Sequence, residues 1–172
     1  MPYALLSSLW ISVLLLFGTV FSGVGFFGKE AWLRNHLVFA LTAVMLSLFA
    51  HTMTMFYFIG TGKKIKDFMA EWDEESRRVI RQKIIVMKRK LFPWMMLVCA
   101  VIMAAFILGG AADARVVKPM VHTVFAYASL FIHVHVSALE SIYIFRNIQL
   151  IHEVNLLAQD RETRSLGKRI GE

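Results

Sequence analysis

The segment VKPMVHTVFAYASLFIHVHVSALESIYIF, residues 117–145, decides the fold of this chain. It is a long apolar run with three histidines inside it. A helix needs about 20 residues to cross the roughly 30 Å hydrocarbon core of a bilayer, so this run is long enough. Of all 172 residues, 58% are hydrophobic, and the mean hydropathy is +0.60. This composition excludes an ordinary soluble domain and predicts an integral membrane protein.

Three further runs of similar character precede this segment. None of them alternates apolar and polar residues as a barrel strand does, so all are predicted to be helices. The four predicted spans cover residues 3–27, 32–59, 92–112 and 117–145. The first is too long for the apolar region of a signal peptide and has no basic residue before it, which favours a retained span. The sequence therefore predicts an all-α, integral membrane, four-helix up-down bundle over residues 1–150, followed by a tail, residues 151–172.

Basic residues set the expected orientation. The formal net charge is +7, and residues 61–91 hold ten of the nineteen Lys and Arg residues. The positive-inside rule then predicts a basic, amphipathic, cytoplasmic connection between spans 2 and 3, with both termini in the cytoplasm. The expected location is a bacterial inner (plasma) membrane. Because this topology and the lipid bilayer account for the charge, no nucleic-acid partner is expected.

Five of the six histidines lie within the apolar runs: His36, His51, His122, His133 and His135. A polar group buried in lipid needs a partner, so such a cluster indicates function. Imidazole is also a common axial ligand of haem iron. At about 100° per residue, His133 lies under His122 and His51 lies roughly under His36, whereas His135 points elsewhere. The predicted ligand pairs are His36–His122 and His51–His133, and depth alone leaves His135 open as the inner ligand.

Charged residues beside the histidines suggest further roles. Arg34, Arg115 and Lys118 flank the outer histidines, where they would pair with haem propionates or anchor the helices at the interface. Glu140 lies on the histidine stripe of the fourth span. It would take up protons near a quinone site, or form an ion pair with Arg146.

Small residues occupy the first and third spans, which carry no histidine. Gly25, Gly109 and Gly110 lie near the predicted outer ends of these spans, at the level of His36 and His122. They would let a haem edge approach the backbone, or serve helix packing. The single cysteine, Cys99, excludes a covalent haem attachment motif, so any haem would be bound non-covalently. No internal repeat is expected beyond the hydropathy pattern of two hairpins.

Histidines on the second and fourth of four spans, with glycines on the first and third, resemble the haem-carrying bundle of the respiratory cytochrome b family. The resemblance covers residues 1–150 at the level of architecture. It implies two b-type haems, one near each membrane face, held by His36 with His122 and by His51 with His133. The histidine spacings of fifteen and eleven residues depart from the equal spacing of that family.

The expected function is that of an electron-transfer subunit of an oxidoreductase complex. It would pass electrons across the bilayer through two haems, between quinone and a partner redox protein. A partner subunit or a homo-oligomer is expected, because little of the chain lies outside the spans. Two alternatives remain open: a haem-free metal transporter or membrane metalloenzyme, and a structural or assembly subunit of a larger membrane complex.

Overall fold

The computed structural model describes residues 1–23 and 29–170, and their side chains except for residues 29–34 and 165–170. This part of the chain forms four helices: α1 (Pro2–Gly23), α2 (Lys29–Phe68), α3 (Glu74–Asp113) and α4 (Pro119–Ile170). Each is long and apolar enough to cross a membrane. The prediction of an all-α chain with four apolar helices of this kind is confirmed.

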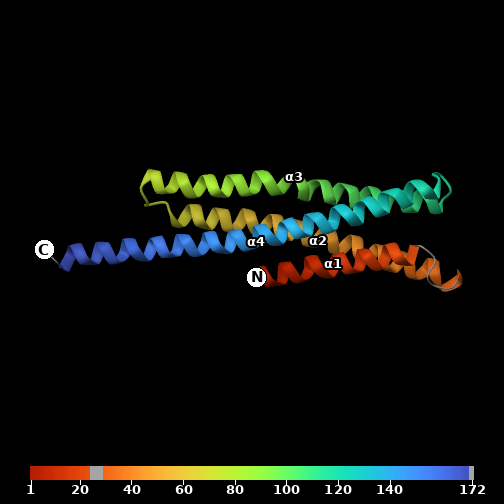
Figure 1. Cartoon of the computed structure of the whole chain (residues 1–172), viewed down its shortest axis with the longest axis horizontal. Helices are drawn as coiled ribbons and strands as arrows, with labels where there is room; N and C mark the ends of the chain where they lie inside the picture. Colours follow the sequence, from red (N-terminus) through yellow and green to blue (C-terminus); the bar gives the residue numbers. More distant parts are fainter. Residues whose placement is uncertain (24–28, 171–172) are drawn as a thin grey trace.

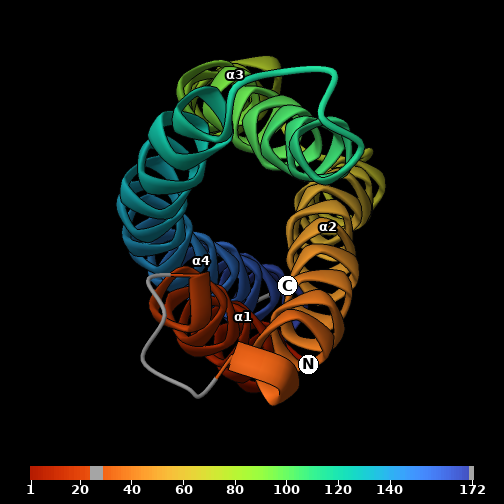
Figure 2. The same cartoon turned by 90° about the vertical axis from the view of Figure 1, so that its right-hand side faces the viewer.

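Consecutive helices run in opposite directions along one common axis (Figure 1). Viewed along that axis, the four helices form a ring in which α1 contacts α2 and α4, while α3 contacts α2 and α4 (Figure 2). The helices α2 and α4 therefore face each other across the bundle. Because they are separated in sequence by α3, they also run parallel, so both present their histidines in the same order along the axis.

One end of the bundle extends well beyond the N-terminus of α1 (Figure 1). The end of α2, the start of α3 and the end of α4 make this three-helix extension, whose small apolar core contains Ile65, Met69, Ile80, Leu150 and Val154. The predicted connection, residues 61–91, is thus mostly helix, with a turn at residues 69–73. The predicted tail continues α4 as far as Ile170.

Local sequence explains this helical connection. The side chain of Asp73 caps α3 by accepting a hydrogen bond from the backbone N–H of Ser76 at 2.8 Å. A cap of this type satisfies one of the amide donors that a helix start leaves unpaired. Several spaced apolar residues of this connection, Ile65, Met69 and Ile80, face one another in the core of the extension.

The bundle has an apolar exterior and a partly polar interior. Large apolar side chains such as Leu14, Met45 and Phe131 are exposed. Among the side chains that the structure describes, the buried polar ones are Ser12, Thr19, Ser22, Ser47, His51, Thr54, Ser129, His133, Ser137, Glu140 and Asn147. This distribution is the reverse of that in a soluble bundle and is typical of helices that face lipid.

Candidate functional site

Four histidines line the interior of the bundle at two levels. His36 and His51 come from α2, and His122 and His133 come from α4. His135 lies apart from them, because it is exposed on the outer face of α4 and its ring packs edge-on against Trp94, with centroids 5.6 Å apart. The structure thus brings together the two predicted pairs and leaves His135 outside them.

The outer pair, His36 and His122, is held by matching contacts. The hydroxyl of Ser22 donates its hydrogen to the carbonyl oxygen of Thr19. Nδ1–H of His36 is therefore the donor in its own two contacts, with the hydroxyl oxygen of Ser22 at 3.1 Å and with the carbonyl oxygen of Thr19 at 3.2 Å. On the other hairpin, Nδ1 of His122 lies 3.1 Å from the carbonyl oxygen of Ala105. A carbonyl partner at Nδ1 fixes the tautomer in which Nε2 carries the lone pair that binds a metal.

A glycine on the neighbouring helix makes room for each of these rings. A Cβ atom added to Gly23 would lie 3.3 Å from Cε1 of His36, and one added to Gly109 would lie 3.0 Å from Cε1 of His122. Gly109 therefore serves the packing of a histidine ring. Gly23 has the same role, although the sequence did not single it out as a site residue.

These contacts repeat with a constant offset of 86 residues. The offset relates the carbonyls of Thr19 and Ala105, the two glycines and the two histidines. The segments that begin at the histidines are HLVFA (36–40) and HTVFA (122–126). The same offset relates buried core positions: Leu5 and Leu91, Leu9 and Met95, Leu16 and Ile102, Ala50 and Val136, Phe58 and Ile144. The two hairpins are thus structural repeats about a pseudo-two-fold axis, contrary to the expectation of no repeat beyond hydropathy.

The outer pair opens onto a cavity of about 450 Å³ between all four helices. Its walls are largely small or apolar, including Ala40, Ala105, Gly110 and Ala126, with His36 and His122 among them. The centroids of the two imidazole rings lie 6.3 Å apart. The cavity falls within the size range of small-molecule and cofactor sites.

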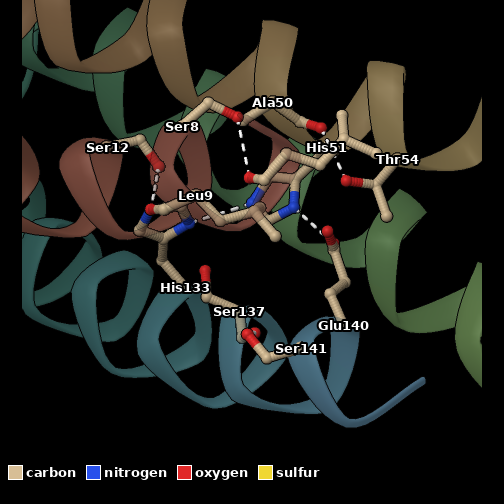
Figure 3. Close-up of polar contacts among 11 residues, drawn as sticks. Ser8, Leu9, Ser12, Ala50, His51, Thr54, His133, Ser137, Glu140 and Ser141 are labelled. Carbon is tan, nitrogen blue, oxygen red and sulfur yellow. Dashed lines mark hydrogen bonds and ion pairs between the residues drawn. The ribbon is translucent and has the colours of Figure 1, made fainter. Parts of the chain in front are cut away.

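The inner pair forms a different kind of site (Figure 3). Nε2 of His51 lies 2.9 Å from Nδ1 of His133, and the two rings are therefore in direct hydrogen-bond contact. Nδ1 of His51 lies 2.5 Å from a carboxyl oxygen of Glu140, and Nε2 of His133 lies 3.0 Å from the hydroxyl of Ser12. All four side chains are fully buried.

The inner histidines do not obey the repeat. His133 follows His51 by 82 residues, four fewer than the offset that relates the outer pair. Four residues are about one helical turn, or roughly 6 Å. In the repeat, His51 corresponds to Ser137, and His133 corresponds to Ser47. The inner level therefore has two histidines at different depths, whereas the outer level has two at the same depth.

The remaining predicted site residues lie as follows. Arg115 and Lys118 are exposed in the connection between α3 and α4, where Arg115 has a positive φ of 58°. Glu140 contacts His51, whereas Arg146 stacks over the ring of Tyr143. Gly25 and the side chain of Arg34 lie outside the described residues.

The histidine pairs are not part of a larger metal-binding cluster among the described residues, and no known protein matches the chain. Among the described residues, no group of three or more His, Cys, Asp and Glu side chains could hold a metal ion. No family model, no curated protein and no solved structure matches this chain. The pairwise geometry of the histidines therefore carries the functional argument.

Proposed function

We propose that this protein is a membrane-embedded cytochrome that holds one haem b between His36 and His122 and transfers electrons through it. The haem, when bound, would supply one-electron chemistry, while His36 and His122 would hold it and the chain would supply an apolar cavity. The observation that carries the proposal is the 6.3 Å separation of the two ring centroids.

This separation agrees with two imidazoles on one metal. With metal–nitrogen bonds of about 2.0–2.1 Å, and about 1.1 Å from each nitrogen to its ring centre, the two centroids would lie about 6.3 Å apart. The Nδ1 contacts of both rings support the same arrangement, because they leave the lone pair on Nε2, the atom through which each ring would hold a haem iron. The neighbouring cavity offers small-residue walls to a flat macrocycle.

One haem is proposed instead of the expected two. A second haem would need His51 and His133 to separate from their 2.9 Å contact, and His133 would have to give up its contact with Ser12. The one-turn offset of the inner pair also opposes a shared iron. The inner histidines are therefore assigned to the polar network of the bundle, not to iron.

The membrane setting is part of the proposal. The apolar exterior and four long apolar helices support insertion, and α1, with 22 residues, is about 33 Å long, close to the thickness of the hydrocarbon core. The basic three-helix extension then faces the cytoplasm, and the outer histidine pair lies toward the opposite face. A quinone and a partner redox protein remain the proposed electron carriers on either side of the haem.

The test is an absorption spectrum of the purified protein. The reduced protein is expected to show a b-type α-band, which His36→Ala abolishes and His135→Ala, a control on the outer face, leaves intact. A colourless protein that retains its fold would contradict the proposal and favour a structural subunit. A colourless protein with a bound transition metal would favour the metal-transport alternative.

A further inference from the structure

The inner polar cluster is a continuous hydrogen-bonded line at mid-bundle (Figure 3). It runs from Ser12 on α1 through His133 on α4 and His51 on α2 to Glu140 on α4. Ser12 is near the middle of α1, so the line lies near the middle of the proposed membrane. A buried carboxyl group beside two imidazoles in this position is costly and is typical of proton-handling sites.

The contacts of Ser12 determine which atoms donate and which accept along this line. The hydroxyl of Ser12 donates to the carbonyl of Leu9 at 2.7 Å, so Nε2–H of His133 donates to the Ser12 oxygen. A neutral imidazole has one donor and one acceptor. Nδ1 of His133 therefore accepts from Nε2–H of His51. This leaves a single proton between Nδ1 of His51 and Oε1 of Glu140, which are 2.5 Å apart.

The other carboxyl oxygen of Glu140 has no partner within normal hydrogen-bond geometry, although the side chain is fully buried and the hydroxyl of Thr54 on α2 lies close enough to interact with the carboxyl group. The hydroxyl oxygens of Ser47 and Ser137, on the facing helices α2 and α4, are also buried without partners. Buried polar atoms are normally paired, so such a group requires an explanation. Oε2 of Glu140 is therefore an open position at which the pair that shares one proton could accept a second.

A route to this oxygen leads from the three-helix extension. Thr54, Thr61 and Asn147 lie on the interior faces of α2 and α4 between Glu140 and the extension, and the amide of Asn147 donates to the hydroxyl of Thr61 at 3.1 Å. Asn147 is two helical turns from Glu140, on the same side of α4. The described part of the interior therefore contains polar side chains that could pass a proton from the proposed cytoplasmic end to Glu140.

The titratable neighbours of this carboxyl group are few. His51 faces it from α2, His133 lies one step further on α4, and Cys99 on α3, half-buried, is near enough to interact with its charge. From α1, the described part of the line contains only the hydroxyl of Ser12. Protonation of Glu140 therefore depends on the two imidazoles, on the Cys99 thiol and on the charge of the proposed haem.

We propose that the Ser12–His133–His51–Glu140 line is a redox-linked proton acceptor. For each electron that a haem held by His36 and His122 would take from a quinol or a reduced partner protein, one proton would move from cytoplasmic water to Oε2 of Glu140. When that electron passes to an acceptor, the proton would return to water. This inference rests on the proposed function, because it requires the outer haem.

The size of the coupling follows from the separation of the two levels. Fifteen residues of α2 separate His36 from His51, which is a rise of about 22 Å. At an effective dielectric constant of ~20, one added electron at that distance raises the proton affinity of the acceptor about threefold. Since a tenfold change corresponds to 59 mV for one electron, the haem potential is expected to fall by about 30 mV as pH rises through the titration of the site.

The experiment measures the haem potential of the full chain against pH, together with the reduced-minus-oxidised infrared spectrum. The wild type is expected to show the pH-dependent shift and a carboxylic-acid C=O band. Glu140→Gln should remove both. Glu153→Gln changes a carboxylate of the same helix in the three-helix extension, where it pairs with Lys83, and should leave both unchanged.

Two results would overturn the inference: a wild-type potential independent of pH, or a shift and band that persist in Glu140→Gln. If that variant fails to fold, His51→Gln tests the same line, because it removes the group that shares the proton with Glu140. The presence or absence of haem distinguishes a failure of the proposed function from a failure of this inference. A colourless wild-type protein refutes the cytochrome, whereas a haem protein with a pH-independent potential refutes only the proton acceptor.

Discussion

Gly109→Ala gives the most stringent test of how the outer histidine pair is built. The new Cβ atom would lie 3.0 Å from Cε1 and 3.3 Å from Nδ1 of His122, whereas ordinary contact begins at 3.4 Å. The ring must therefore move by about 0.4 Å or more, by analogy with other overpacked sites. If it moves directly away from α3, the 3.1 Å contact between its Nδ1 and the carbonyl of Ala105 lengthens to about 3.5 Å, outside the usual hydrogen-bond range.

The expected cost combines overpacking, at about 1–3 kcal/mol, with the lost hydrogen bond, at about 0.5–1.5 kcal/mol. The better helix propensity of Ala offsets about 1 kcal/mol of the loss in stability. We therefore expect haem affinity to fall by about 0.5–3.5 kcal/mol, or roughly two- to 400-fold. The assay is a haem titration of the apoprotein in detergent, followed by absorbance.

A glycine away from the cavity provides a matched control. A Cβ atom added to Gly18 on α1 would meet no atom within 4 Å, and Gly18 is not among the residues that line the cavity. Gly18→Ala should therefore keep wild-type affinity, while Gly109→Ala loses it. Equal affinities for the two variants would refute the reasoning that Gly109 is required for the position of the His122 ring.

Three further outcomes are expected. Gly23→Ala should weaken haem binding less than Gly109→Ala in the same titration, because its Cβ would approach the ring of His36 only to 3.3 Å; a larger loss would contradict the repeat. Ser47→His places a histidine at the depth of His133 but should leave the haem content measured by pyridine haemochrome unchanged, because His133 keeps its contacts with His51 and Ser12; a raised content would count against the assignment of the inner histidines to the polar network. The hydrogen bond from Arg161 holds the pKa of Asp73 well below its usual range, so this pair stabilises the fold above the ordinary carboxyl pKa and loses that contribution as pH falls. Asp73→Asn should therefore reduce the acid sensitivity of thermal unfolding, and an identical pH profile would exclude this role.

The sequence predicted the helices and the interior stripe well, because both depend on local periodicity. Hydropathy located all four helices, and the angular positions of His133 and His135 anticipated that one would face the interior and the other the outside. Apolar run length and 100° steps along a helix are properties of single segments, so they require no knowledge of how the helices pack.

Contacts between residues on different helices were harder to predict from the sequence. The contact of His51 with Glu140 joins residues 89 positions apart and depends on the relative axial shift of α2 and α4, which no single segment reveals. The same holds for Ser12, which was not expected at the site. One signal was available: the segments HLVFA and HTVFA share an offset with the pairs Gly23–Gly109 and Thr19–Ala105. A search for this repeat would have shown that the inner histidines are one turn out of register.

The connection between α2 and α3 illustrates a different limit. Its sequence predicted a basic, amphipathic connection, and the structure makes this segment the ends of two helices that pack with α4 in the three-helix extension. The apolar positions of Ile65, Ile80 and Leu150 fit either a bilayer surface or a small core. Only the presence of a third helix beside them distinguishes these two structures.

The most direct test of the central claim is the haem-to-chain ratio, measured by pyridine haemochrome in the wild type and in two variants. A single haem held by the outer pair predicts a ratio of about one in the wild type, about zero in His122→Ala and about one in His133→Ala, since two axial imidazoles hold one haem iron. A wild-type ratio near two that falls to one in each variant would contradict it, and would show that the inner histidines bind a second haem.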